Sequence, residues 1–328
     1  MRTVRRILVA VKEPMAKRLP AVDKAAQLAR ALGAQLELFH AISAPMYLGY
    51  EGFDGGNLAQ VENARRVQFK SRLEALAGPL RSQGISVTTG AEWDFPAGEA
   101  IVRRAARTQA DLIVAECHSG EHHRSWLLRL TDWELLRHSP VPVLLVKSKR
   151  PYRHPVVLAA VDPSHAFAKP AKLDAEILRA AASVKNALRG TLHAVHAYVP
   201  MPTDAKPSEL LDPAATEILD ARARTHARAR VQPLFKKIKV APGRRHLVGQ
   251  HPINAIPDLA REIGCGILVM GAISRSGLKR IFIGNTAERI LDEIECDVLV
   301  VKPPGFPSRI PHAKRGARVV IPPMQLSF

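Results

Sequence analysis

The chain repeats one order of strand-like and helix-like segments twice, and this internal duplication constrains the fold more than any other feature. A strand-like run at Ile7–Val11 is followed by helical spacing of apolar residues that ends at Gly33, and then by a second strand-like run. The second half repeats this order, with a run at Val156–Val161 and helical spacing that ends at Gly190. Glycine after helical spacing is a typical C-terminal stop, so each half predicts strand, helix, strand.

Two further pairs of segments match at one fixed offset. Residues 111–115 match 266–270, and residues 142–147 match 297–302, in both cases 155 positions later. Short β-branched runs that alternate with helical patterns are typical of βαβ units around a parallel sheet. The sequence therefore predicts an α/β fold made of two tandem, Rossmann-like domains, one in each half.

The domain boundaries follow from composition. Two prolines, three cationic side chains and a histidine make 148–155 a short, solvated connector, so we place the first domain at 1–150 and the second at 151–306. Residues 307–328 contain arginine and lysine but no acidic residue, and they are predicted to form a basic flexible tail. The stretches 45–57 and 200–213 are rich in proline and glycine and should be loops beside the carboxyl ends of the strands.

Composition excludes several classes of protein. The longest apolar runs, such as Ile7–Val11 and Ile267–Met270, fall far short of the ~18 residues of a membrane-spanning helix. Lys12 and Glu13 end the first run too early for an export signal, so we expect the protein to stay in the cytoplasm. The three cysteines show no CxxC spacing, which predicts reduced and mostly buried thiols rather than a disulfide framework.

The chain is strongly basic. It has 48 Lys and Arg against 30 Asp and Glu among its 328 residues, a formal net charge of +18, while aromatic residues make up only 5%. Because the excess charge is spread over both halves and aromatic residues are scarce, we expect non-specific attraction to polyanions rather than readout of a nucleic-acid sequence.

The turn after the fourth strand of the second half is rich in glycine. Gly271, Gly277 and Gly284 permit backbone amides to approach an anion, and Asn285 and Thr286 follow at the start of a helical pattern. Asn285 or Thr286 can equally act as an N-cap, and tight turns need glycine without any ligand. The turn therefore suits a phosphate site but does not by itself establish one.

The stretch from Ile267 to Pro303 resembles the universal stress protein family, and the duplicated architecture is similar to its tandem two-domain members. The resemblance covers about residues 5–305. It implies a five-stranded parallel sheet of the adenine nucleotide alpha hydrolase-like type in each domain. ATP-binding members carry Gly-x2-Gly-x9-Gly, then Ser or Thr, plus an aspartate after the first strand. The resemblance places the ligand-binding candidates at Asp162, Ala197, Gly271, Ser274, Gly284, Asn285 and Thr286.

This chain departs from the nucleotide-binding pattern. Ser274 stands in place of the second glycine and Asn285 in place of the hydroxyl residue, which weakens the prediction of tight ATP binding. In the first half, Glu116 replaces the first glycine and Lys12 replaces the aspartate. An acidic side chain there would repel phosphate, so ATP is a candidate ligand of the second domain only.

Other polar clusters favour structural interpretations. His118, His122 and His123 suit a solvated basic loop better than a metal site. His40 and His196, at equivalent strand ends, suit hydrogen-bonded core histidines better than a shared functional pair. Four arginines in an alanine-rich helical segment suit a solvated face; they are Arg222, Arg224, Arg228 and Arg230.

The last strand of each repeat would expose unpaired amides at a sheet edge. Antiparallel pairing of 141–146 with 298–301 would remove both edges, which is the dimerisation mode that the resemblance implies. We therefore expect an intramolecular pseudo-dimer, as a monomer or as a homodimer of such chains.

Three functions remain open. The resemblance implies a cytoplasmic, non-catalytic stress-response factor that supports survival of growth arrest and DNA-damaging agents, acting through a ligand or partner. That ligand would be small and phosphorylated, or lipid-like. The alternatives are an ATP-binding or ATP-hydrolysing switch and a basic protein associated with nucleic acid. No catalytic triad, paired carboxylates or P-loop is recognisable, so we do not expect an enzyme.

Overall fold

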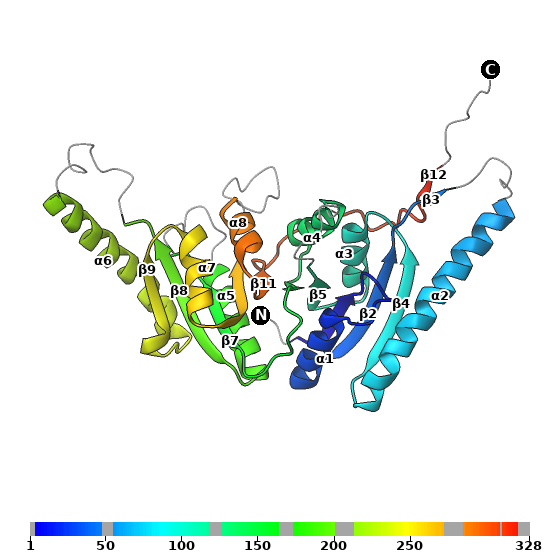
Figure 1. Ribbon diagram of the computed structural model, residues 1–328, viewed down its shortest axis with the longest axis horizontal. Coiled ribbons are helices and arrows are strands. Elements are labelled where there is room, and N and C mark those ends of the chain that lie inside the picture. The colour runs from blue at the N-terminus through cyan, green and yellow to red at the C-terminus, as the bar shows by residue number, and fades with distance from the viewer. Residues whose placement is uncertain are drawn as a thin grey trace, which may run out of the picture. The chain divides into compact units, whose positions relative to one another are not determined.

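The computed structural model describes residues 4–47, 55–117, 126–163, 173–200, 213–271, 285–308 and 310–320. The chain divides into two compact units (Figure 1). The unit called the first domain combines Arg2–Val146 with Pro307–Phe328, and the unit called the second domain is Lys147–Phe306. Both have the predicted α/β architecture with parallel strands.

Among its described residues, the first domain has a sheet of five parallel strands in the order β4-β2-β1-β5-β6. β1 lies at the centre because it pairs with β2 on one side and with β5 on the other. The strands are β1 (Arg6–Ala10), β2 (Gln35–Ile42), β4 (Val87–Trp93), β5 (Leu112–Glu116) and β6 (Val143–Val146). The helices are α1 (Pro20–Leu32), α2 (Gly55–Ser82), α3 (Ala97–Arg107) and α4 (Trp126–His138).

The described part of the second domain repeats this topology with the order β9-β8-β7-β10-β11. Its strands are β7 (Val156–Ala160), β8 (Thr191–Tyr198), β9 (Arg245–Gly249), β10 (Cys265–Gly271) and β11 (Asp297–Val301). Its helices are α5 (Leu173–Ala187), α6 (Pro213–Lys237), α7 (Pro252–Glu262) and α8 (Asn285–Glu293), with a short 3-10 helix at Pro242–Arg244. The predicted antiparallel pairing of the last strands of the two domains stays a prediction.

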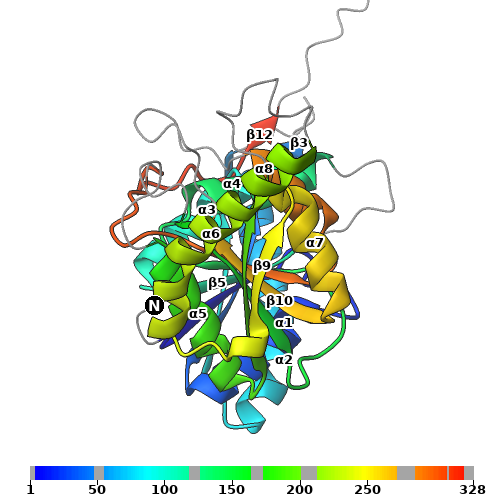
Figure 2. The ribbon, with the colours of Figure 1, turned by 90° about the vertical axis from the view of Figure 1, so that its left-hand side faces the viewer.

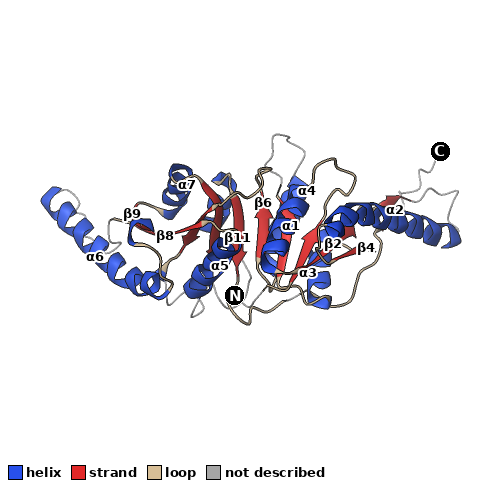
Figure 3. Cartoon of the chain, turned by 90° about the horizontal axis from the view of Figure 1, so that it is seen from below, coloured by secondary structure: helices blue, strands red, loops and turns tan. Residues whose placement is uncertain are grey.

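Helices cover both faces of each sheet, as right-handed crossovers between parallel strands require. In the second domain α5 and α6 lie on one side of β9 and α7 on the other (Figures 2 and 3). The central strands are consequently buried on both faces, and Leu8, Val9, Leu158 and Val269 are all fully buried. Burial on both faces explains why these strands are continuous apolar runs without alternation.

Gly190 has a different role from the predicted helix stop. The left-handed residue after α5 is Arg189, with φ of 51°, whereas Gly33 after α1 adopts φ of 63° as predicted. A Cβ on Gly190 would lie 2.1 Å from the carbonyl oxygen of Pro155, because the chain that enters β7 passes directly beside it. Gly190 is therefore required by this close backbone approach.

The connector is exposed at Lys149, Arg150 and Arg153, as predicted, but it is also anchored on the second domain. The fully buried carboxylate of Asp297 accepts hydrogen bonds from the backbone N–H groups of Lys147 and Ser148, at 3.0 and 2.9 Å. The hydroxyl of Tyr152 donates a third, at 2.6 Å. Composition did not reveal this, because the partner lies far away in sequence at the start of β11.

The predicted flexible tail is also different in the structure, where residues 310–320, here called the C-terminal strap, bind the first domain. Val319–Val320 form β12, which pairs in parallel with β3 (Met46–Tyr47) inside the stretch predicted as a loop. The backbone N–H of Arg315 donates to Asp94, at 2.9 Å. Lys314 and Arg315 of the strap form ion pairs with Glu92 and Glu99 of the first domain, and these ion pairs help to hold the strap in place. Residues 48–54 and 201–212 of the predicted loops lie outside the described residues.

Candidate ligand site of the second domain

The carboxyl ends of β7 and β10 lie side by side, at the position where the strand order of the second domain reverses. In open parallel sheets this switch point is the usual place for a ligand. Asp162 follows β7 after Val161, and its backbone N–H donates to Oδ1 of Asp174 in the first turn of α5, at 3.0 Å. Gly271 ends β10. The structure thus brings Asp162 and Gly271, two predicted site residues, to one edge of the sheet.

Gly271 also has a packing role. A Cβ at this position would lie 2.8 Å from Cδ2 of Leu173 and 3.3 Å from Cδ1 of Ile177, both on α5 and both buried. Since α5 occupies the space beside Gly271, the glycine is needed for helix packing whether or not a ligand binds.

The remaining predicted site residues are only partly described. Ala197 is a half-buried residue of β8 that pairs with Val248 of β9. Asn285 is the first residue of α8, as the helical pattern predicted, and Thr286 follows half-buried. Ser274 and Gly284 lie outside the described residues.

His40 and His196 are core histidines, as predicted. Nδ1 of His40 lies 2.8 Å from the carbonyl oxygen of Val11, and Nδ1 of His196 lies 3.2 Å from that of Val161. Each histidine thus ties its second strand to the residue after the first strand of its own domain. Burial lowers the pKa of His40, opposed by its hydrogen bond to Val11.

The corresponding edge of the first domain carries charges of its own. Lys12 follows β1 and Glu116 ends β5, where the second domain has Asp162 and Gly271. Asp132 of α4 is buried, and burial raises its pKa to about 6, while the charge of Lys12 and a hydrogen bond with Cys117 oppose the rise. Sequence reasoning missed Asp132 because it lies mid-helix and outside any motif. A buried carboxyl group at this edge is unsuited to a phosphate.

Two lysines that directly follow the last strands of the repeats, Lys147 and Lys302, were not singled out from sequence. Lys147 Nζ donates to the carbonyl oxygen of Leu291, at 2.7 Å, and to that of Ile294, which satisfies two carbonyl groups at the C-terminus of α8. Lys302 is buried, lies 4.6 Å from the ring centre of Phe306, and has its pKa lowered to about 8 by burial. Their repeated position after a strand was the available signal.

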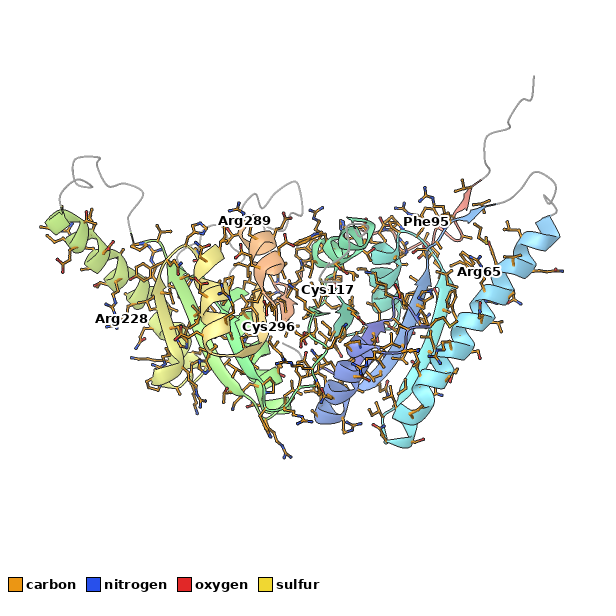
Figure 4. All side chains as sticks on the ribbon, in the orientation of Figure 1. Arg65, Phe95, Cys117, Arg228, Arg289 and Cys296 are labelled. Carbon is orange, nitrogen blue, oxygen red and sulfur yellow. The ribbon has the colours of Figure 1, made fainter. Side chains whose placement is uncertain are left out.

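The four arginines of α6 are exposed, which confirms the predicted solvated face. Figure 4 labels Arg228 on this helix. Residues 118–125, which include the predicted histidine loop, lie outside the described residues, and the described part of the chain contains no group of three or more potential metal ligands. The three cysteines are free and half-buried.

The family model described as universal stress protein family matches residues 3–147 and again 156–302. The fold and the switch-point edge thus define a tandem α/β protein of this class, and the chain belongs to the universal stress protein family. Relatives named universal stress protein E are similar over much of their length. The one from Salmonella typhi is 29% identical over 315 residues, covering 90% of this chain and 94% of the relative, and the one from Escherichia coli K12 is 31% identical, covering 67% and 69%.

Solved structures agree with this assignment. A protein of unknown function from Pseudomonas aeruginosa PAO1 is 26% identical, covers 92% of this chain and 93% of its own, and superposes with a TM-score of 0.68. A universal stress protein from Archaeoglobus fulgidus, at 18% identity and a TM-score of 0.57, shares the fold over 90% of this chain and 96% of its own. No helix among the described residues combines the length and apolar character that crossing a membrane would need.

Proposed function

We propose that this chain is a cytoplasmic, non-catalytic stress-response protein that binds a small phosphorylated ligand at the carboxyl edge of its second sheet. Through that ligand or a partner it would support survival of growth arrest and of DNA-damaging agents. Membership of the universal stress protein family supports the stress-response role. The contrast between the two sheet edges supports the choice of the second domain.

That contrast is the observation that carries the proposal. At the second edge, Asp162 follows β7 and Gly271 ends the adjacent strand β10, and α8 begins further along the chain at Asn285. An aspartate in this position can accept hydrogen bonds from a sugar hydroxyl, and helix N-termini favour negative charge. At the first edge, Lys12 and Glu116 replace these residues. A single ligand per chain, held by the second domain, follows from this difference.

ATP is the ligand to test first, because the family resemblance aligns Asp162 with the aspartate of ATP-binding members. Titration calorimetry of the full chain with ATP and magnesium should give binding with one site per chain. Asp162→Ala should weaken it at least about tenfold, because loss of a charged hydrogen-bond acceptor costs about 1.5 kcal/mol or more. Lys12→Ala, the equivalent position of the first domain, is the matched control and should leave binding unchanged.

Other results would redirect the proposal. Absence of heat at millimolar ATP would exclude ATP as the ligand and with it an ATP-dependent switch. Equal loss of binding in Asp162→Ala and Lys12→Ala would overturn the assignment to the second domain. Native mass spectrometry of protein purified without added nucleotide would then test for a co-purified phosphorylated or lipid-like molecule.

The net charge of +18 supports weak association with polyanions as a second candidate function. The C-terminal strap is a poor candidate for the contact, because Lys314 and Arg315 bind Glu92 and Glu99 of the first domain. A Lys314→Ala and Arg315→Ala double variant should therefore bind duplex DNA with the same salt dependence as the wild type. A salt slope reduced by about 0.9 for each lost phosphate contact would contradict this expectation.

A further inference from the structure

Two cysteines of the second domain lie next to each other in space although 31 residues separate them in sequence. Cys265 is the first residue of β10, and Cys296 directly precedes β11. Because β10 and β11 are parallel neighbours, with Ile267 opposite Asp297, both cysteines lie at the amino edge of the sheet. Their sulfur atoms are 3.7 Å apart. Figure 4 labels Cys296 at this position.

The surroundings of the pair suit a reaction between the two sulfurs. Both cysteines are half-buried rather than fully enclosed, so a small oxidant such as a peroxide can reach them from solution. The Sγ of Cys265 also lies 3.8 Å from the carbonyl oxygen of Val156, and the pairing between β10 and β7 shifts register between Cys265 and Ile267. An irregular strand start adjusts more easily than a regular ladder, which favours the small approach that a bond of about 2.05 Å requires.

We propose that Cys265 and Cys296 are a redox site that closes to an intramolecular disulfide when the protein meets a peroxide. The thiolate of one cysteine attacks the peroxide oxygen and becomes a sulfenic acid, which releases hydroxide. The thiol of the other cysteine then attacks the sulfenic sulfur and displaces its oxygen as water. In sum, two thiols and one hydrogen peroxide give one disulfide and two waters.

Electrostatics assign the two roles. The hydrogen bond between the two sulfur atoms lowers the pKa of Cys296, and a backbone hydrogen bond from Leu268 and the charge of Lys147 act in the same direction, while burial and Asp297 oppose them. The hydrogen bond with Cys296, together with burial, raises the pKa of Cys265. Cys296 is therefore the thiolate that reacts first, and Cys265 is the thiol that resolves the sulfenic acid.

This site is separate from the proposed ligand edge. Asp162 and Gly271 lie at the carboxyl ends of the strands, whereas the cysteine pair lies at the amino ends. The inference therefore does not rest on nucleotide binding. Cys296 immediately precedes Asp297, the residue that anchors the connector through Lys147, Ser148 and Tyr152. A disulfide here would fix the start of β11 and thereby the anchor of the connector.

The test uses the folded full chain with Cys117→Ser as background, so that only the pair remains. Treatment with a small excess of hydrogen peroxide should remove two hydrogen atoms from the intact mass, and dithiothreitol should restore them. Cleavage after Arg261, Arg275, Arg289 and Arg309 places Cys265 and Cys296 in separate tryptic peptides, which should appear joined before reduction. The same joined peptides should appear in the wild type.

Single variants in that background separate the roles. Cys265→Ser should leave a sulfenic acid on Cys296 that reacts with a dimedone-type probe, whereas Cys296→Ser should label at least about tenfold less. Circular dichroism checks that each variant is folded, and the wild-type peptide map provides a test without any substitution. The proposal is overturned if both thiols stay fully alkylatable after peroxide treatment, if they join only in urea, or if oxidation links different chains.

Discussion

The hydroxyl of Tyr152 donates a hydrogen bond of 2.6 Å to Oδ2 of Asp297, so the segment between the domains is fastened to a fully buried carboxylate. Burial, and next the charge of Asp297, raise the pKa of Tyr152 well above its ordinary value, which keeps the hydroxyl protonated as a donor. The other oxygen of Asp297 accepts the N–H groups of Lys147 and Ser148. One side chain therefore fixes both ends of a six-residue stretch of connector, 147–152.

Asp297→Ala should release the connector. Three donors would lose their acceptor, at about 1 kcal/mol or more each, so the thermal midpoint of the second domain should fall clearly. Limited trypsin digestion should then cut after Lys149 or Arg153 several-fold faster than in the wild type. Asp258→Ala, which removes an exposed ion pair with Arg261, is the matched control and should change neither measurement. Unchanged digestion of Asp297→Ala would contradict the anchoring role.

Arg103→Ala should strongly destabilise the first domain. The guanidinium of Arg103 binds Asp94 through two hydrogen bonds of 2.8 Å, and both side chains are almost fully buried. Removal of one partner leaves a buried charge unpaired, which typically costs about 3–5 kcal/mol.

Arg107→Ala is the control for this change. Arg107 binds Glu92 at 2.6 Å with its side chain 40% exposed, so its loss should cost no more than about 1 kcal/mol. Chemical denaturation monitored by a first-domain probe compares the two variants. Equal losses of unfolding free energy would show that the buried Arg103–Asp94 pair contributes no more to stability than the exposed pair of Arg107 with Glu92.

Asp132→Asn should stabilise the protein at high pH. Burial raises the pKa of Asp132 from 3.8 to about 6. The unfolded chain thus releases this proton at lower pH than the folded chain, and stability falls as the pH rises from about 4 to 6. Above pH 6, the raised pKa lowers the free energy of unfolding by its full amount, about 3 kcal/mol. The advantage of Asp132→Asn should therefore reach up to about 3 kcal/mol at pH 8 and vanish near pH 4.

Thermal melts from pH 4 to 8 test the Asp132 prediction. Asp23→Asn, at an exposed position on α1, is the control and should show no comparable pH dependence. An Asp132→Asn variant that is less stable than the wild type at pH 8 would show that the partnership with Lys12 and Cys117 outweighs the cost of burial.

Gly271→Ala should destabilise the second domain by about 1–3 kcal/mol, since the new Cβ would crowd Leu173 and Ile177. Leu173→Ala should be less harmful in the Gly271→Ala background than alone, because the two changes share one space. Gly78→Ala, where a Cβ meets nothing within 4 Å, is the control and should not destabilise. Additive losses for Gly271 and Leu173 would contradict the packing role.

The fold was predictable because local sequence patterns indicate its strands and helices. The central strands are apolar runs buried on both faces, as at Leu8 and Leu158. Because the sequence is duplicated, one predicted topology describes both domains. The placement of Asp162 and Gly271 at one edge also followed, because parallel strands end together. The role of Gly271 did not follow, since a glycine required by Leu173 looks in sequence like a glycine required by a phosphate.

Long-range polar pairing was not predictable. Asp297 binds the connector 145–150 positions away, and Asp94 binds the backbone of Arg315, 221 positions away. Such contacts leave no periodic pattern in the sequence. Composition also gave no sign of them, because a cationic segment with prolines indicates a solvated connector and does not reveal a buried carboxylate elsewhere in the chain. The pairing of Cys265 with Cys296 was hidden for the same reason, because only the sheet brings the two strand starts together.

The C-terminal strap has a consequence for the order of assembly during synthesis. The first domain contains residues that precede the second domain in sequence and residues that follow it. When the ribosome has released the first 146 residues, Arg103 and Asp94 can already meet, but β3 still lacks β12 and Asp94 still lacks Arg315. The amino-terminal domain is thus begun first and completed last, so a prematurely terminated chain leaves it unfinished.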